Sequence, residues 1–421
     1  MARSVWAGTG ATLVSEAIGR GAAMGFQLLV ANQLGADRFG IVALALASAA
    51  LLSPLADTGL PNLALRLVSE SPDDDDLVRL LGGLKLLLTP LFVVPLAIWA
   101  AWRFVGKDDS MALVWAGAFY GFQASSDLLR QILRARQEVG RELFARIAYP
   151  IGNIIALLAV WRFRPGPAGA LLALASGPAA LMVAYLAVLP RGCRVPRTGP
   201  SPAMARRYSP FLLQSIGYLL VVGFATRIDA FLLEKYSGRP DVGRYFAALN
   251  LVMAGGFFAQ GLSSYLYPRL HRQRERRGRA LARAVGLQAA LGIALALGAA
   301  LIGPILFRSV FHARSFAGAD ELLPGMGFLL CLSTMDWLWL SILIGRNRIW
   351  VAVLNLAPIL ATKIVLGPIL VSRWGAAGMV WTAIIGQIPT GILGAATASR
   401  AFLRPASERS ASDSRWNASG E

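Results

Sequence analysis

The chain has 421 residues, of which 56% are hydrophobic and 15% charged, with a mean hydropathy of +0.56 and a formal net charge of +18. Soluble proteins carry about 25% charged residues, so this composition excludes a soluble globular protein and indicates a polytopic membrane protein. The basic residues gather in connections between apolar runs, where orientation in a membrane explains them and no nucleic-acid partner is needed.

Apolar runs of about 20 residues, the length that crosses a bilayer, recur along the whole chain. The first run contains Glu16 and Arg20 and has no small-residue cleavage site, so we expect it to remain as a helix. The two cysteines, Cys193 and Cys331, lie too far apart in the sequence to suggest a disulfide framework or a metal site. The sequence predicts an all-α membrane protein with twelve transmembrane helices over residues 9–33, 39–63, 80–102, 111–133, 144–162, 168–189, 210–234, 243–266, 283–307, 322–344, 349–371 and 376–398.

Basic residues are divided unequally between the two sides of these helices. Of the 41 lysines and arginines, 26 fall on one side, 11 on the other and four inside the helices. Because cytoplasmic loops carry the excess of basic residues, the bias predicts that both termini are cytoplasmic. We expect a multi-pass protein of the bacterial cytoplasmic membrane.

The connections are too short for a soluble catalytic domain, since the longest has about twenty residues. Metalloprotease, phosphate-loop and Ser/His/Asp patterns are missing from the sequence. The run from Asp73 to Asp76 is interpreted as a solvated turn at a helix start. The chain is therefore predicted not to be an enzyme. Its last residues, 405–421, are rich in Ser, Ala and charge and are predicted to be disordered.

A short motif recurs in the second half of the chain at an ungapped offset of 203 residues. Gly35, Gly40 and Arg66-Leu67 correspond to Gly238, Gly243 and Arg269-Leu270. Each half contains six predicted helices, an even number, so both halves enter the membrane in the same direction. We expect two pseudo-symmetric six-helix bundles around a central cavity. The predicted units are residues 1–190, a basic cytoplasmic linker at 191–209, a second bundle at 210–404 and the tail at 405–421.

The motifs also resemble a known family. The matching residues are Leu34-Gly35 with Phe39-Gly40, Asp57-Thr58-Gly59-Leu60-Pro61-Asn62, Arg227-Ile228-Asp229, Gly243-Arg244-Tyr245 and Tyr267-Pro268-Arg269-Leu270. Their order and spacing resemble Wzx-type polysaccharide flippases, which belong to the MOP superfamily with MATE drug exporters and the lipid II flippase MurJ. The resemblance covers about Ala11 to Ala401.

This resemblance implies a flippase that moves an undecaprenyl-pyrophosphate-linked oligosaccharide from the cytoplasmic to the periplasmic leaflet by alternating access. Membrane lipids and other polysaccharide-assembly proteins are the further partners that it implies. Two other classes stay open. A MATE-like multidrug exporter of the same fold favours an acidic or apolar cavity for cationic cargo. A membrane-embedded polymerase or glycosyltransferase is expected to carry a large periplasmic loop with paired acids.

Basic residues inside the predicted helices are the candidate substrate-binding residues, because a charge at the bilayer centre costs about 2.5–3.5 kcal/mol and needs a reason. Arg20 and Arg227 lie in equivalent helices, one helical turn apart under the repeat, and a guanidinium matches two oxygens of a pyrophosphate. Lys363 lies deep in the eleventh helix. Arg20 has an alternative interpretation as a salt bridge with Glu16 on the same helix.

Acidic residues inside the helices have two open interpretations. They bind a coupling ion, H+ or Na+, or they pair with Lys85 and the other intramembrane basic residues. These acids are Glu16, Asp57, Asp127, Asp229 and Asp336. No other cofactor and no metal are predicted.

A cluster of arginines follows the eighth predicted helix. It is interpreted as an orientation signal that touches anionic headgroups, or as a cytoplasmic mouth that gathers an anionic substrate. The cluster consists of Arg269, Arg272, Arg274, Arg276 and Arg277.

Overall fold

The computed structural model describes residues 2–103, 109–163, 166–194, 202–272, 277–311, 314–346 and 348–403, and these ranges contain α-helices and short 3-10 turns but no strand. The first half contains α1 (Ala2–Asp57), α2 (Leu60–Glu70), α3 (Asp75–Arg103), α4 (Asp109–Ala135), α5 (Val139–Arg146), α6 (Ala148–Phe163), α7 (Pro167–Val188) and the turn η1 (Arg191–Cys193). The second half contains α8 (Pro202–Tyr236), α9 (Arg239–Arg272), α10 (Arg277–Leu301), α11 (Gly303–Val310), η2 (Arg314–Phe316), η3 (Asp320–Leu322), α12 (Leu323–Gly345), α13 (Ile349–Leu354), α14 (Ala357–Val365) and α15 (Gly367–Leu403).

These helices correspond to the twelve predicted transmembrane segments, but several segments are merged or broken. Helix α1 contains the first segment and most of the second, separated by a kink at Gly35. The eleventh segment is divided among α13, α14 and the start of α15, which kinks at Gly375 before the twelfth. Among the described residues, nine helical stretches are long and apolar enough to cross a membrane. Of the remaining segments, the first two share one of these stretches, the eleventh is shortened by its breaks, and the fourth forms the continuous helix α4, which is not among the nine.

Helix α8 begins at Pro202, earlier than the predicted start at residue 210. Proline suits the first turn of a helix because its missing N–H has no partner there. Residues 202–209 of the predicted linker therefore belong to helix α8. The predicted disordered tail at 405–421 lies outside the described residues.

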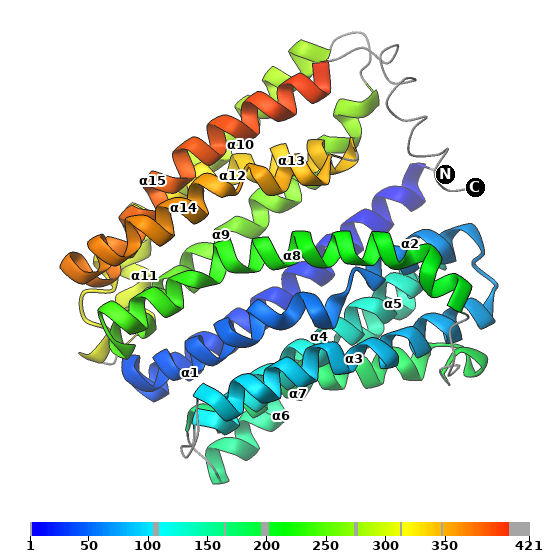
Figure 1. The fold of residues 1–421 in the computed structure, drawn as a ribbon, viewed down its shortest axis with the longest axis horizontal. Coiled ribbons are helices and arrows are strands. Elements are labelled where there is room, and N and C mark those ends of the chain that lie inside the picture. Colours follow the sequence, from blue (N-terminus) through cyan, green and yellow to red (C-terminus); the bar gives the residue numbers. More distant parts are fainter. Residues whose placement is uncertain are drawn as a thin grey trace.

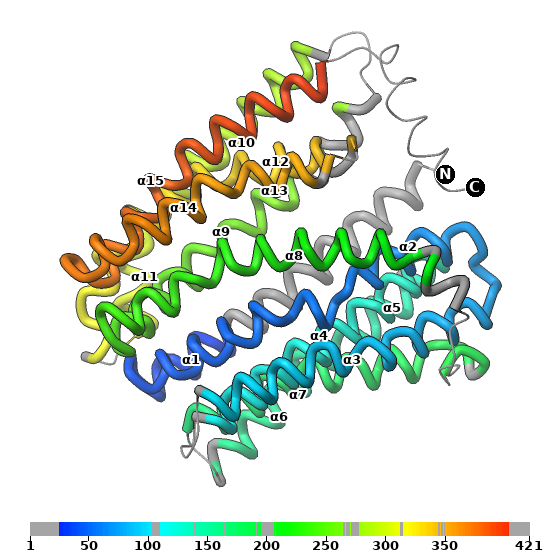
Figure 2. The backbone as a smooth tube through the Cα atoms, viewed as in Figure 1, coloured from blue at the N-terminus to red at the C-terminus, as the bar shows by residue number. Residues whose placement is uncertain are grey.

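The two halves form groups of helices that diverge toward the side where α15 ends (Figure 1). Helix α1 of the first group contacts α8 and α9 of the second, and these three helices form the boundary between the groups. Figure 2 shows the same course of the chain as a tube. We call the groups the first bundle, α1 to α7, and the second bundle, α8 to α15. The side where α15 ends is the terminal side, and the other is the closed side.

Three hydrophobic cores explain this divergence. The largest core contains residues of both bundles at the closed side, including Phe39 of α1, Tyr245 of α9 and Phe316 of η2. On the terminal side one core lies around Tyr185 of the first bundle and includes Leu212 of α8, and another lies around Trp339 within the second bundle. Burial of apolar surface therefore joins the bundles broadly at the closed side, whereas on the terminal side α8 is the element of the second bundle that packs into the core of the first.

The repeated glycines meet at the closed side. Gly35 and Gly238 have φ of 73° and 99°, a left-handed conformation that favours glycine. A Cβ on Gly40 would collide with the carbonyl oxygen of Arg239, and a Cβ on Gly243 would collide with that of Ala36. Ala36 and Arg239 are themselves equivalent under the repeat. The sequence repeat is therefore a pseudo-symmetric, backbone-to-backbone contact between the bundles, which we call the glycine contact.

Candidate functional site

The second bundle contains a buried ion pair deep inside its helices. Nζ of Lys363, on α14, lies 2.7 Å from Oδ1 of Asp229, on α8, and the two side chains are 4% and 5% exposed. Lys363 also donates a hydrogen bond of 2.6 Å to the carbonyl of Ala225, and the Tyr245 hydroxyl donates one of 2.8 Å to Asp229 Oδ2. The Lys363 ammonium thus contacts two oxygens, and the two carboxylate oxygens of Asp229 contact Lys363 and Tyr245.

The first bundle holds its intramembrane lysine differently. Lys85 on α3 is buried and donates a hydrogen bond to the carbonyl of Ala56 at the end of α1. Asp57 and Asp127 interact with it electrostatically. Among the described residues, however, no carboxylate lies within ion-pair distance of Lys85. Asp127 instead pairs with Arg130 of its own helix, at 2.8 Å.

A break in the second transmembrane segment exposes the carbonyl that Lys85 uses. Helix α1 ends at Asp57 and α2 begins at Leu60, because Thr58 and Gly59 have φ of 55° and 74°. A β-branched residue rarely adopts this left-handed conformation, so Thr58 is strained. The Asp57 carboxylate accepts a hydrogen bond of 3.1 Å from the Gly59 N–H and so holds the turn between α1 and α2.

Arg227 lies on α8, where this helix passes α1. A Cβ on Gly223, one turn earlier, would lie 3.7 Å from the Ala50 carbonyl oxygen and 3.9 Å from the Leu51 Cα, both on α1. Because residues four apart share a helix face, Arg227 faces the seam between the bundles. Its side chain is half-buried, and among the described residues it forms no hydrogen bond or ion pair.

The remaining predicted site residues are distributed over several places. Asp336, on α12, accepts a hydrogen bond from the Gln387 side-chain amide on α15. The side chains of Glu16 and Arg20, on α1, lie outside the described residues. The same holds for the predicted basic mouth, Arg269, Arg272, Arg274, Arg276 and Arg277. The structure therefore brings Asp229 and Lys363 together and places Arg227 separately at the seam.

A buried polar cluster on the terminal side was not expected from the sequence. Glu142 on α5 is almost fully buried and accepts hydrogen bonds from Arg134, with Nε 2.9 Å from Oε2, while Arg146 lies 3.7 Å away. The spacing of Glu142 and Arg146, four residues apart on a helix, was the available signal. Arginines that the sequence suggested only as orientation signals are thus also held by a structural carboxylate.

The cysteine of the turn η1 is another group on the terminal side. Cys193 Sγ lies 3.0 Å from Oδ1 of Asp75, which also pairs with Arg136 at 2.7 Å. Burial, together with the hydrogen bond to Asp75, raises the pKa of the Cys193 thiol to about 11. Both cysteines are free. Asp75, in the first turn of α3, therefore links α3, α4 and η1.

Comparisons with known proteins define the class of this fold. An inward-facing multidrug MATE transporter of the MOP superfamily is 15% identical, with a TM-score of 0.71 over 92% of this chain and 94% of that one. The lipid II flippase MurJ in an inward closed conformation is 12% identical, with a TM-score of 0.70 over 93% of this chain and 88% of that one. A MOP superfamily transporter from Pyrococcus furiosus is 15% identical, with a TM-score of 0.60 over 94% of this chain and 96% of that one.

The chain thus has the fold of MOP superfamily transporters and flippases, in which twelve helices form two pseudo-symmetric bundles. A family model described as polysaccharide biosynthesis protein matches residues 5–274. The chain belongs to this polysaccharide biosynthesis protein family. No curated protein matches it. The sequence-based prediction of the fold is confirmed, and the family match agrees with the predicted link to polysaccharide assembly.

Proposed function

We propose that this protein is a Wzx-type flippase, which moves an undecaprenyl-pyrophosphate-linked oligosaccharide from the cytoplasmic to the periplasmic leaflet of the bacterial cytoplasmic membrane. The position of Arg227 carries the proposal. Three intramembrane cations have described side chains, and Lys85 and Lys363 are both held by protein oxygens. Arg227 is the one that faces the seam with no hydrogen-bonding partner among the described residues.

An arginine between two bundles, without a hydrogen-bonding partner in the described part of the chain, suits an anionic headgroup. Its planar guanidinium donates two parallel hydrogen bonds to neighbouring phosphate oxygens. A cationic cargo would be repelled at this position, which argues against a multidrug exporter. The match to the polysaccharide biosynthesis family supports a glycan-linked substrate.

The position of the shared core supports a direction of transport. With the chain ends in the cytoplasm, as the bias of basic residues predicts, the glycine contact closes the periplasmic side, and on the cytoplasmic side α8 is the element of the second bundle in the core of the first. The substrate would enter near the predicted basic mouth and leave when the glycine contact separates. A reporter that is active only in the periplasm should therefore be silent when fused after Gly420; activity there would refute this orientation.

A coupling ion, H+ or Na+, remains part of the proposal. Asp229 and Asp127 are engaged in ion pairs, whereas the described hydrogen-bonding partner of Asp336 is the neutral amide of Gln387. Asp336 is therefore the acid to which we assign coupling. Transport that persists in proteoliposomes without a proton or sodium gradient would remove coupling from the proposal.

The experiment is glycan export with Arg227 substituted. We expect Arg227→Ala to abolish export at normal protein levels, and Arg227→Lys to impair it because an ammonium loses the bidentate geometry. Arg373→Ala is the matched control, since Arg373 is an exposed arginine of the second bundle near the Gly375 kink. Normal export by Arg227→Ala would contradict the role of Arg227, and export of cationic dyes by the unchanged protein would contradict the proposed substrate.

A further inference from the structure

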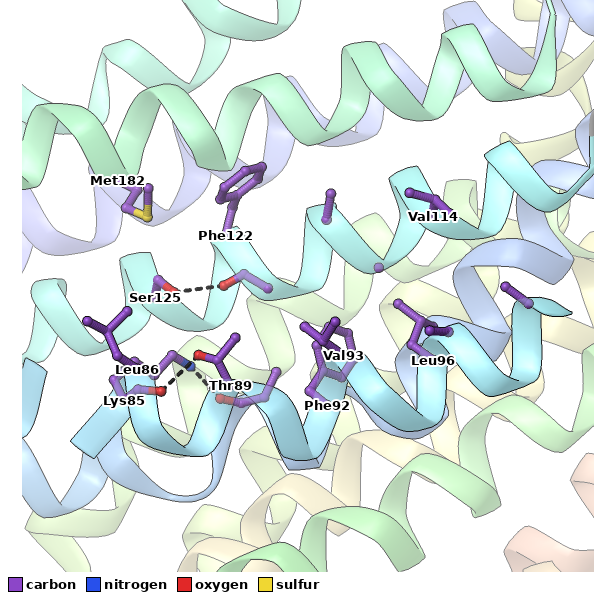
Figure 3. A pocket seen from close by; sticks show the side chains of 16 residues that line it. Lys85, Leu86, Thr89, Phe92, Val93, Leu96, Val114, Phe122, Ser125 and Met182 are labelled. Carbon is purple, nitrogen blue, oxygen red and sulfur yellow. Dashed lines mark hydrogen bonds between the residues drawn. The ribbon is translucent and has the colours of Figure 1, made fainter. Parts of the chain in front are cut away.

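The first bundle contains a cavity of about 440 Å³ between α3 and α4 (Figure 3). Its lining is almost entirely apolar and includes Phe92, Val93 and Leu96 of α3, Val114 of α4 and Met182 of α7. Lys85, Thr89 and Ser125 contribute polar atoms at one end. The proposed flippase mechanism does not use this cavity.

The cavity opens on the outer face of the bundle. Its lining residues Leu86, Val93 and Val114 are 58%, 49% and 46% exposed. Leu86 and Val93 lie on α3, which is long and apolar enough to cross a membrane, so the medium beside them is hydrocarbon and not water. An apolar cavity with this opening is accessible to lipid chains directly from the bilayer.

The polar groups of the cavity are already engaged within the protein. The Thr89 hydroxyl donates to the Lys85 carbonyl at 2.8 Å, and the Ser125 hydroxyl donates to the Gly121 carbonyl at 2.9 Å. The Lys85 ammonium donates to the Ala56 carbonyl. A bound water needs two to four polar partners, and an unpaired polar ligand group costs free energy in such a site. The occupant is therefore a hydrocarbon chain.

The position of the cavity indicates which chain it takes. Along α3 it runs from Lys85 to Ala100, about 22 Å at 1.5 Å per residue, and it begins about 15 Å from the helix start at Asp75. It thus extends from the bilayer centre toward the closed side. At the same height on α3, Trp99, outside the lining, contacts Phe231 of α8, with ring centroids 6.1 Å apart, so this end of α3 stands between the cavity and the seam of the bundles.

We infer that this cavity holds the isoprenoid chain of the lipid-linked substrate while the headgroup passes along the seam. The inference rests on the proposed function. A chain held beside the seam stays in the bilayer, and the headgroup then crosses without drawing the chain into a polar pathway.

Photolabelling tests the inference without any glycan. The probe is a polyprenyl phosphate with a photoreactive group in its chain, added to the full-length protein in liposomes. We expect labelling of α3 and α4 that unlabelled polyprenyl phosphate competes away. Phosphatidylglycerol with the same photoreactive group in an acyl chain is the comparison probe. Equal labelling of these helices by that phospholipid, or absence of polyprenyl labelling, would overturn the inference.

Two matched variants locate the label. Ala97 lines the cavity, whereas Ala101, one turn further along α3, is exposed and outside the lining. Ala97→Phe should lower labelling about tenfold, equivalent to ~1.4 kcal/mol of binding free energy, while Ala101→Phe should leave it unchanged. If Ala97→Phe fails to fold, Ala118→Phe fills the cavity from α4. Unchanged labelling in a folded cavity variant would contradict the inference.

The outcomes for the chain and for the glycan are distinguishable. Labelling uses a lipid without sugar, and glycan export reports on Arg227. Cavity labelling together with normal export by Arg227→Ala would refute the role of Arg227 and keep the polyprenyl site. Loss of export by Arg227→Ala without cavity labelling would keep the role of Arg227 and refute the polyprenyl site.

Discussion

Lys85 in the first bundle and Lys363 in the second are both buried, and each donates a hydrogen bond to the carbonyl of an alanine, Ala56 and Ala225. Their surroundings differ. Lys363 is neutralised by Asp229 at 2.7 Å and is enclosed. Lys85 lacks a described carboxylate at ion-pair distance and lines an open cavity. The two bundles are therefore symmetric in backbone but not in charge.

This difference shows which parts of the repeat are constrained. The glycine contact needs the same residue type in both halves, because the two backbones approach each other there symmetrically. A buried lysine needs only oxygen partners, which a helix break or a carboxylate supplies equally well. The second bundle is thus locked by an ion pair, whereas the first keeps a cavity open.

The largest loss of stability is expected from Lys363→Ala. Removing the ammonium leaves the Asp229 carboxylate buried and uncompensated, which should cost about 3–5 kcal/mol of unfolding free energy. The double variant Asp229→Ala with Lys363→Ala should recover much of this loss. Thermal unfolding in detergent measures both, with Lys235→Ala as the exposed control. A single variant as stable as the control would show that the ion pair does not hold α14 to α8.

A smaller effect is expected from Gly243→Ala, which forces a methyl group against the Ala36 carbonyl. Such overpacking costs about 1–3 kcal/mol and should separate the closed side. The measurement is maleimide labelling of Ala36→Cys in a chain without Cys193 and Cys331, and labelling should rise.

Two comparisons control this experiment. Gly261→Ala, on the same helix and with open space around its Cβ, should leave labelling unchanged. Gly40→Ala should raise it as Gly243→Ala does, because the contact is pseudo-symmetric. Different responses of Gly40→Ala and Gly243→Ala would break the symmetry of the glycine contact.

The smallest effect is expected from Lys85→Ala. It leaves the Ala56 carbonyl without its donor but strands no carboxylate at ion-pair distance, so about 1–3 kcal/mol should be lost. Thermal unfolding beside Lys363→Ala gives the comparison directly. If the two lysine variants are equally destabilised, Asp57 or Asp127 is paired with Lys85 as tightly as Asp229 is with Lys363.

The candidate site was predictable as a set of residues but not as a set of pairs. The cost of a charge in hydrocarbon singled out Lys363, Asp229 and Arg227. Which acid meets which base depends on how α14 lies against α8, and this contact joins residues more than 130 positions apart. The Tyr245 hydroxyl gave no signal, because a tyrosine in an apolar helix is common at membrane depth. The cavity beside Lys85 was equally invisible, since it depends on the space between α3 and α4.

By itself the sequence determined the fold class, the number of segments, the repeat and its glycines, because hydrocarbon requires long apolar helices and only glycine tolerates the left-handed and close-packed positions. The tertiary structure decided where the helices break, which charges pair, and that the largest core shared by the bundles lies on the closed side. These features arise from side-chain packing between distant segments, and the hydrophobic periodicity of a single segment does not encode its neighbour.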